Sequence, residues 1–239
     1  MGVGVYLSAI SGWYQPQVDL SVRIETGPGW VHDAVVRAMT EWNRQETAFI
    51  KEYYPNESYA LVAGCAANPA PACLRSGSIN PRNSFVLYED ESAVNPMVSV
   101  IFSPVHSVQT SSMELTCSGS ELAVTGFDGS RFTISVLSAL TNVADNATSR
   151  DVLYRVMLHE FGHVMGLGHI FDGKDIMDGT AYFIRNPARQ SFISTTDLYA
   201  IRELAESAGS NGAGSSRISF IALPASIPYD LVNVSQPYV

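Results

Sequence analysis

Apolar and polar residues alternate along residues 18–25, VDLSVRIE, where every second position is a branched apolar side chain. This period of two predicts a half-buried strand. The sequence GPGW then interrupts the pattern, and over residues 31–50 apolar side chains recur every three to four positions, which predicts an amphipathic helix. A strand followed by a long helix indicates a crossover onto a sheet.

The remaining apolar runs predict further strands and two more helices. Strands are predicted over residues 58–64, 84–90 and 97–105, with a surface loop rich in Pro, Gly, Asn and Cys over residues 64–83. Residues 120–127 and 130–137 flank Asp128 and Gly129, a pair typical of a two-residue hairpin turn, so the two segments are predicted to pair antiparallel. Helices are predicted from Thr148, which has capping-box spacing to Asp151, to residue 165, and over residues 195–207.

The composition divides the chain into three parts. Residues 18–207 contain the predicted strands and helices and form one predicted domain. Residues 1–17 are an apolar lead segment, either the remnant of a trimmed leader or a first strand. Residues 208–239 begin with the Gly/Ser-rich linker SAGSNGAGSS and continue as an extended segment that either docks back or forms a stalk.

The balance of charge argues against nucleic acid as a partner. The chain has 23 acidic and 14 basic residues, a net charge of -9, and only two lysines, Lys51 and Lys174. Phosphate neutralisation needs a clustered basic surface, which this composition does not supply. The chain contains no run of eighteen apolar residues, so no transmembrane helix is predicted. The protein is also predicted to act as a monomer.

Cysteine usage and glycosylation sequons favour an extracellular or cell-surface location. Cys65 and Cys73, in CAANPAPAC, either close a small disulfide loop or remain buried thiols, and Cys117 is left over. Three NxS/T sequons are compatible with an exported glycoprotein; they begin at Asn56, Asn146 and Asn233.

Three of the five histidines lie in one short stretch, HEFGHVMGLGH, at His159, His163 and His169. On a helix, the first two project from one face about one turn apart, so both imidazoles can reach one zinc ion. A glycine at Gly166 can adopt the left-handed conformation that ends a helix and turns the chain, which returns His169 to the same metal. Three imidazoles leave one coordination position open, which is the arrangement of catalytic rather than structural zinc.

Glu160 follows the first histidine and points to a different side of the helix. Beside the open coordination position it can accept a proton from a water molecule and then deliver it to a leaving amine. The alternative is a set of helix histidines that bind no metal, or an inactive relative that keeps the pattern.

The stretch RDVLYRVMLHEFGHVMGLGH resembles the zinc motif of the metzincin metalloendopeptidases, and it is most similar to their matrixin (matrix metalloproteinase-like) branch. Met177, in KDIMDG, then corresponds to the family's Met-turn residue. The resemblance continues in STTDLYAIRELAESA, similar to the family's C-terminal helix, and in the first strand and helix.

The resemblance implies a fold, an activity and a way of binding substrate. The fold is α+β: a twisted, mostly parallel five-stranded sheet with one antiparallel edge strand, three main helices, and a cleft between an upper subdomain, to about residue 166, and a lower one. The activity is that of a secreted zinc endopeptidase. A protein or peptide substrate binds extended along the edge strand, residues 120–127. The apolar substrate pocket is assigned to Tyr182, Phe183 and Ile184, unless these side chains belong to the lower core.

Some features of the matrixin pattern are absent. Ile170 follows the third histidine where matrixins usually have a small hydroxyl residue, and Asp178-Gly179 replaces Tyr-Pro. Calcium is a possible but unsupported second ion, because Asp172, Asp175 and Asp178 are interpreted as a solvated acidic loop rather than a calcium site.

Two other functions remain open at the level of sequence. The protein could be a surface binding module that uses zinc only for stability. It could also be a latent enzyme in which the thiolate of Cys117 fills the open coordination position, against the simpler interpretation of a buried thiol.

Overall fold

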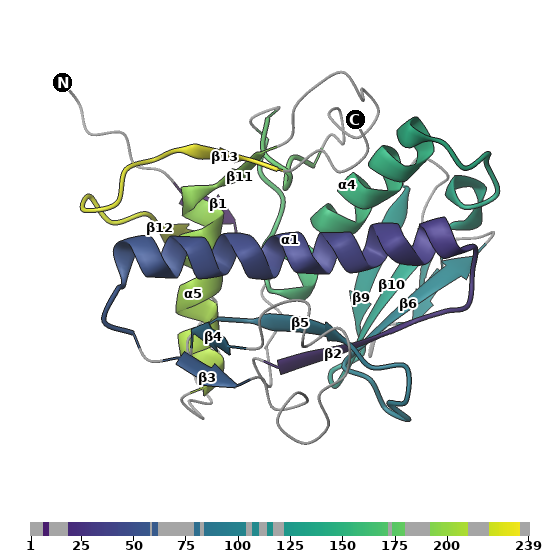
Figure 1. The fold of residues 1–239 in the computed structure, drawn as a ribbon, viewed down its shortest axis with the longest axis horizontal. Coiled ribbons are helices and arrows are strands. Elements are labelled where there is room, and N and C mark those ends of the chain that lie inside the picture. The colour runs from purple at the N-terminus through teal and green to yellow at the C-terminus, as the bar shows by residue number, and fades with distance from the viewer. Residues whose placement is uncertain are drawn as a thin grey trace.

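The computed structural model (Figure 1) describes residues 7–9, 19–57, 59–61, 79–81, 84–103, 107–109, 114–116, 122–171, 174–179, 192–209 and 220–234. No helix in this part of the chain is both long and apolar enough to span a membrane.

A five-stranded sheet forms the centre of the fold. Its strands follow the order β5-β2-β6-β10-β9, and all neighbours run parallel except β9, which is antiparallel to β10 at one edge. This confirms the predicted fold class. The strands are β2 (Asp19–Ile24), β5 (Val86–Glu89), β6 (Val98–Ser103), β9 (Ala123–Phe127) and β10 (Phe132–Leu137).

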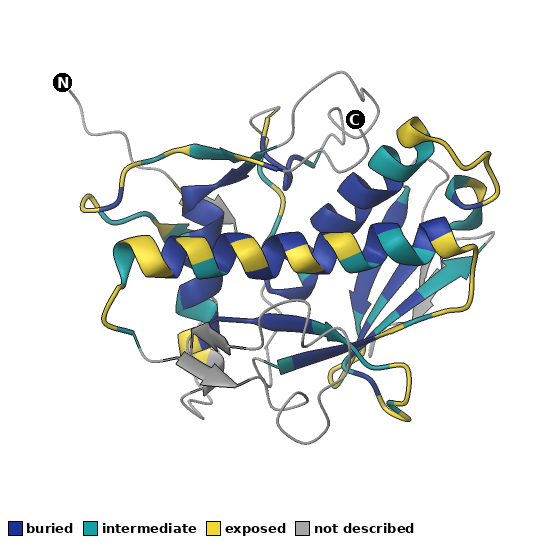
Figure 2. Cartoon of the chain, viewed as in Figure 1, coloured by how far each residue is buried: buried dark blue, intermediate teal, exposed yellow. Residues whose placement is uncertain are grey.

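The described part of the chain contains three α-helices, as predicted, and the first two in chain order pack on this sheet. The three helices are α1 (Gly29–Tyr53), α4 (Ala147–Val164) and α5 (Thr195–Gly209); a short 3-10 helix, η1 (Ser138–Leu140), follows β10. Helix α1 crosses in front of the sheet beside α4 and turns a buried stripe toward the core and an exposed stripe outward (Figures 1 and 2). Within the core, Trp42 Nε1 donates to the Leu158 carbonyl oxygen at 2.8 Å, which ties α1 to α4.

The hairpin between β9 and β10 forms, but its register differs from the prediction. Phe127 pairs with Phe132, and the Asp128 N–H donates to the Arg131 carbonyl at 3.1 Å. The two tip residues are therefore Gly129 and Ser130 rather than Asp128 and Gly129. The physical reason is the Asp128 carboxylate, which accepts hydrogen bonds from the backbone N–H groups of Ser130 and Arg131, both at 2.8 Å. Gly129, with φ 97°, supplies the left-handed conformation that this loop needs.

Helix α4 begins earlier than the capping-box spacing predicted. Its N-cap is Asn146, whose side-chain oxygen accepts from the backbone N–H of Ser149 at 3.0 Å. Asparagine is among the best N-cap residues. Asn146 comes before Thr148 in the chain, so the helix begins before the predicted cap.

The last described segment packs against the rest of the molecule. Strand β12 (Phe220–Ala222) pairs with β1 (Leu7–Ala9), and β13 (Leu231–Asn233) pairs with β11 (Phe192–Ser194). Ile227 and Val234 are buried in the core. The segment therefore docks back, one of the two alternatives left open by the sequence.

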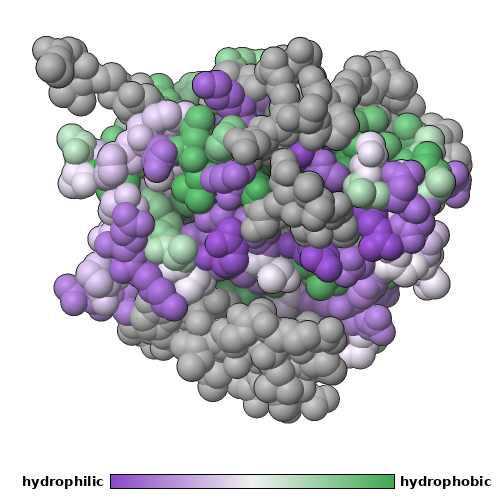
Figure 3. Space-filling view, turned by 45° about the horizontal axis from the view of Figure 1, so that its top comes forward, coloured by the Kyte–Doolittle hydropathy of each residue, from purple (hydrophilic) through white to green (hydrophobic). Residues whose placement is uncertain are grey.

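Two further two-stranded pairs complete the described elements. They are β3 (Tyr59–Leu61) with β4 (Ile79–Pro81), and β7 (Ser107–Gln109) with β8 (Glu114–Thr116). In the space-filling view, hydrophilic residues occupy the centre of the displayed face and hydrophobic residues form separate small areas (Figure 3). The apolar area that the described residues show on this face is therefore divided rather than continuous.

Candidate metal centre

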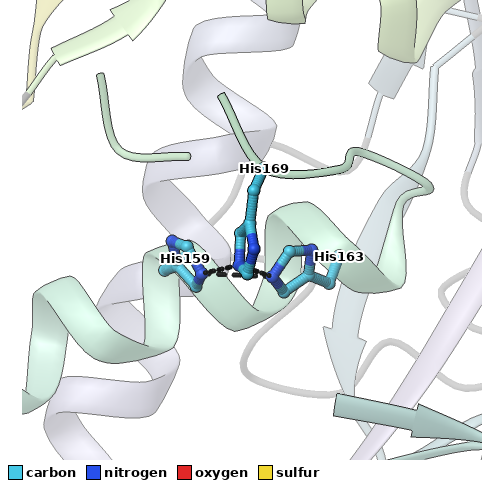
Figure 4. A group of neighbouring side chains, drawn as sticks. All are labelled: His159, His163 and His169. Atoms are coloured by element: carbon cyan, nitrogen blue, oxygen red, sulfur yellow. Dashed lines mark hydrogen bonds between the residues drawn. The ribbon is translucent and has the colours of Figure 1, made fainter. Parts of the chain in front are cut away.

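Helix α4 and the turn after it bring the three motif histidines together. His159 and His163 lie one turn apart in the last part of the helix. Gly166 then adopts φ 101°, and the N–H of Leu167 donates to the carbonyl of Gly162 at 3.0 Å, which closes the helix end. The chain turns back at this point, and His169 faces the two helix histidines (Figure 4).

The three Nε2 atoms converge on one point. They are 3.1 Å apart between His159 and His163, 3.1 Å between His159 and His169, and 3.0 Å between His163 and His169. These separations suit three nitrogens around one metal with bonds of about 2.0–2.1 Å.

The other ring nitrogens decide which tautomer is present. His159 Nδ1 lies 2.7 Å from the carbonyl oxygen of Ile176, and His163 Nδ1 lies 2.9 Å from that of Leu167. A carbonyl oxygen only accepts, so each Nδ1 carries the proton and each Nε2 presents a lone pair. Two lone pairs that face each other at 3.1 Å repel, whereas a cation between them is stabilised. The donor set therefore fits a zinc ion.

The protonation states of these residues also suit metal binding. Burial lowers the pKa of His159 to about 4, and burial places the pKa of His163 well below the usual histidine value. The pKa of His169 is lowered for the same reason, partly offset by the negative charge of Asp178. All three imidazoles are neutral at pH 7, which is the form that binds zinc.

Glu160 lies next to this cluster on the inner side of α4. It is buried, and its Oε2 accepts a hydrogen bond from the Thr125 hydroxyl of β9 at 2.6 Å. Burial raises the pKa of Glu160 to about 7, and the Thr125 hydrogen bond partly opposes that rise. A carboxyl group with a pKa near neutrality is suited to exchange protons with a reacting molecule.

Met177 is buried, and its backbone is paired with the chain after His169. The Ile170 N–H donates to the Met177 carbonyl at 3.0 Å, and the Gly179 N–H donates to the Ile170 carbonyl at 2.9 Å. The carbonyl of the preceding residue, Ile176, is the acceptor that orients His159. Met177 is therefore part of the turn that supports the first histidine.

The interpretation of Asp175 and Asp178 as a solvated loop is wrong, because both are buried. The Asp175 carboxylate accepts from the backbone N–H groups of Met177 at 2.7 Å and Ser194 at 3.2 Å, so it fixes the turn to β11. Asp178 raises the pKa of His159 and His169 through its charge. Both aspartates thus stabilise the surroundings of the three histidines. Their contacts give no evidence for a calcium site.

A second group of possible metal ligands lies between α1 and the end of β5. His32, Glu89 and Glu91 bring one ligand atom each within 4.8 Å of one another. His32 Nε2 already forms a close hydrogen bond with the Glu89 carboxylate, so this pair is explained without a cation.

Several predicted residues lie outside the described part of the chain. They are the pocket residues Tyr182, Phe183 and Ile184, together with Asp172, Cys65, Cys73 and Cys117. Conversely, Thr125 was not predicted as a site residue from the sequence. The available signal was a polar residue that shares one face of the predicted edge strand with two apolar residues, Ala123 and Phe127.

Comparison with known proteins agrees with this geometry. The matrixin family model matches residues 87–205, from β5 into α5, and the matched range includes the three histidines, Glu160 and Met177. A search of curated protein sequences gives no match.

Proposed function

Since the chain is a matrixin-like metzincin, we propose that it is a secreted zinc endopeptidase that uses Glu160 as general base and acid. The observation that carries this proposal is the convergence of three Nε2 atoms next to a buried carboxyl group. A purely structural zinc site usually has four protein ligands, and the described residues offer three here.

Each residue of the site has a distinct task in peptide hydrolysis. His159, His163 and His169 would hold the zinc ion, which when bound acts as a Lewis acid toward the scissile carbonyl and acidifies water. Glu160 would accept the proton of the attacking water and pass it to the departing amine nitrogen. Met177 would support the site from below without touching the reacting atoms.

The edge strand β9 is the proposed platform for the substrate. It pairs with β10 along one side, and no other described strand pairs with its second side. An extended peptide can add there as another strand, through backbone hydrogen bonds that do not depend on sequence. Tyr182, Phe183 and Ile184 remain the proposed pocket for one apolar substrate side chain.

Secretion is supported by the accessibility of the three sequons. The asparagines of all three are exposed, at Asn56, Asn146 and Asn233. Glycosylation at these positions would require no unfolding of the described structure.

The central test is the substitution Glu160→Gln, which keeps the shape of the side chain and removes its basicity. We expect zinc content, measured by atomic emission, to stay at the wild-type level, while cleavage of unfolded casein falls by about 10²–10⁴-fold. Chelation should abolish the wild-type activity, and added zinc should restore it.

The matched control is Glu52→Gln, the same chemical change at an exposed position of α1, which should leave cleavage unchanged. Full activity in Glu160→Gln would refute the proposed mechanism. A zinc-loaded, folded wild type that cleaves nothing at any pH would instead favour a binding module.

A further inference from the structure

We infer that Thr125 is a positioning residue that holds the Glu160 carboxylate in the orientation needed for proton transfer. This inference rests on the proposed peptidase function. It is carried by one contact: the Thr125 Oγ1 hydroxyl lies 2.6 Å from Glu160 Oε2, and it is also 3.3 Å from the Glu160 carbonyl oxygen. A hydroxyl has one proton to donate, and the shorter distance to the carboxyl oxygen shows which acceptor takes it.

Both residues of the hydrogen bond between Thr125 and Glu160 are held rigidly. Thr125 is 7% exposed and Glu160 5%, so neither side chain moves freely in solvent. Thr125 is paired with Ile134 in the β9–β10 ladder, which fixes its backbone. Its β-branched side chain also has few rotamers. The hydroxyl is therefore a fixed point against which the longer glutamate side chain is held.

The hydrogen bond from Thr125 gives the two carboxyl oxygens of Glu160 different roles. Oε2 is engaged by Thr125, which leaves Oε1 for the proton of the attacking water. A glutamate has three rotatable side-chain bonds, and a misplacement of a catalytic group by about 1 Å can cost about 10²-fold in rate. A single anchored oxygen removes much of that freedom before the substrate arrives.

Strand β9 would position both the substrate backbone and the Glu160 carboxylate. β9 is the edge strand proposed to bind the substrate backbone, and it also holds the glutamate through Thr125. The register between the substrate and the base is then set by one element rather than by two that move separately.

The test is Thr125→Val, which keeps the shape of the side chain and removes the hydroxyl. We expect kcat on a fluorogenic peptide to fall about tenfold, with KM within about twofold of wild type, because the variant disturbs proton transfer rather than substrate binding. Zinc content should not change. Thr125→Ser, which keeps a hydroxyl, should recover most of kcat.

The matched control is Ser135→Ala on the neighbouring strand β10. Ser135 is completely buried and its hydroxyl has no hydrogen-bond partner in the described structure. Ser135→Ala removes a buried hydroxyl from the same sheet at a position away from Glu160. We expect its kcat to stay at the wild-type value. Thr125→Ala serves as a second variant should valine disturb folding, and the same loss of kcat is expected.

The outcomes separate this inference from the proposed function. If the zinc-loaded wild type has no peptidase activity, the proposed function fails and the inference fails with it. If the wild type is active but Thr125→Val and Thr125→Ala retain its kcat, only the role of Thr125 is overturned. The same conclusion follows if Thr125→Ser fails to recover kcat, or if Ser135→Ala loses as much of it.

Discussion

At the scale of single residues, Glu46 on α1 is a buried carboxyl group outside the metal centre. It is 2% exposed, and its Oε2 accepts a hydrogen bond from the backbone N–H of Phe85 at 3.1 Å. Its Oε1 has no hydrogen-bond partner in the described structure. Burial therefore raises the pKa of Glu46 well above its usual value, so the folded protein favours the protonated side chain.

This shift predicts how stability depends on pH. A carboxyl group with a raised folded-state pKa contributes stability that is fully present below the unfolded-state pKa and lost as pH rises through the folded-state pKa. Glu46→Gln should therefore match the wild-type Tm near pH 4 and exceed it at higher pH. The gap should grow by about 1.4 kcal/mol per pH unit between the two pKa values, or about 3–6 °C in Tm.

Thermal unfolding followed by circular dichroism from pH 4 to pH 9 would measure this gap. Glu52→Gln, an exposed change on the same helix, is the control and should follow the wild-type curve. Parallel curves for Glu46→Gln and the wild type would contradict the assignment of a protonated Glu46.

At the scale of elements, the contact between α4 and the turn at Met177 depends on a glycine. A Cβ atom placed on Gly162 would lie 2.3 Å from Met177 Sδ and 3.4 Å from a ring carbon of Trp42. Both of those side chains are buried, so neither has open space to move into. Gly162 therefore allows α4 to approach both the turn at Met177 and α1 at the same place.

Gly162→Ala should consequently separate α4 from the turn. Overpacking of this kind costs about 1–3 kcal/mol, or about 2–12 °C in Tm, and zinc affinity should fall because Ile176 orients His159 from the same turn. The control is Gly29→Ala at the start of α1, where an added Cβ meets nothing within 4 Å. An unchanged Tm and zinc affinity in Gly162→Ala would show that Met177 has room to shift.

The elements also show what the sequence could predict and what it could not. The three helices, the five strands of the central sheet and the left-handed turn at Gly166 follow from local periodicity and local backbone preference, and the structure confirms them apart from the start of α4. The hairpin register was wrong, because the Asp128 carboxylate competes for the N–H groups of the turn. The burial of Asp175 could not be predicted, since it depends on Ser194, nineteen residues further along the chain.

At the scale of the whole molecule, the segment from residue 220 to residue 234 packs against β1 and against β11, the strand before α5. Thr195 and Asp230 exchange two hydrogen bonds of 3.0 Å, and β13 pairs with β11. Strand β11 in turn is bridged to Asp175, next to the turn at Met177; β11 is largely buried, whereas β13 is intermediate to exposed (Figure 2). Three-residue strands have no periodicity of their own, so the sequence alone could not assign these pairings.

A chain that ends at residue 210 should therefore be less stable than the full chain. Burial of Ile227 and Val234 alone contributes about 3–6 kcal/mol, which corresponds to a loss of at least about 6 °C in Tm. A chain that ends at Val234 keeps every described pairing and is the control. Equal Tm values for the two truncated chains in differential scanning calorimetry would mean that the segment adds nothing to the domain.

The burial of the histidine rings has a consequence for metal retention in acid. Protons compete with zinc for imidazole nitrogen, and for exposed histidines that competition begins near pH 6.5. With the pKa of His159 at about 4 and those of its two partners also lowered, proton competition starts only in more acidic solution. We therefore expect the proposed zinc ion to be retained at mildly acidic pH.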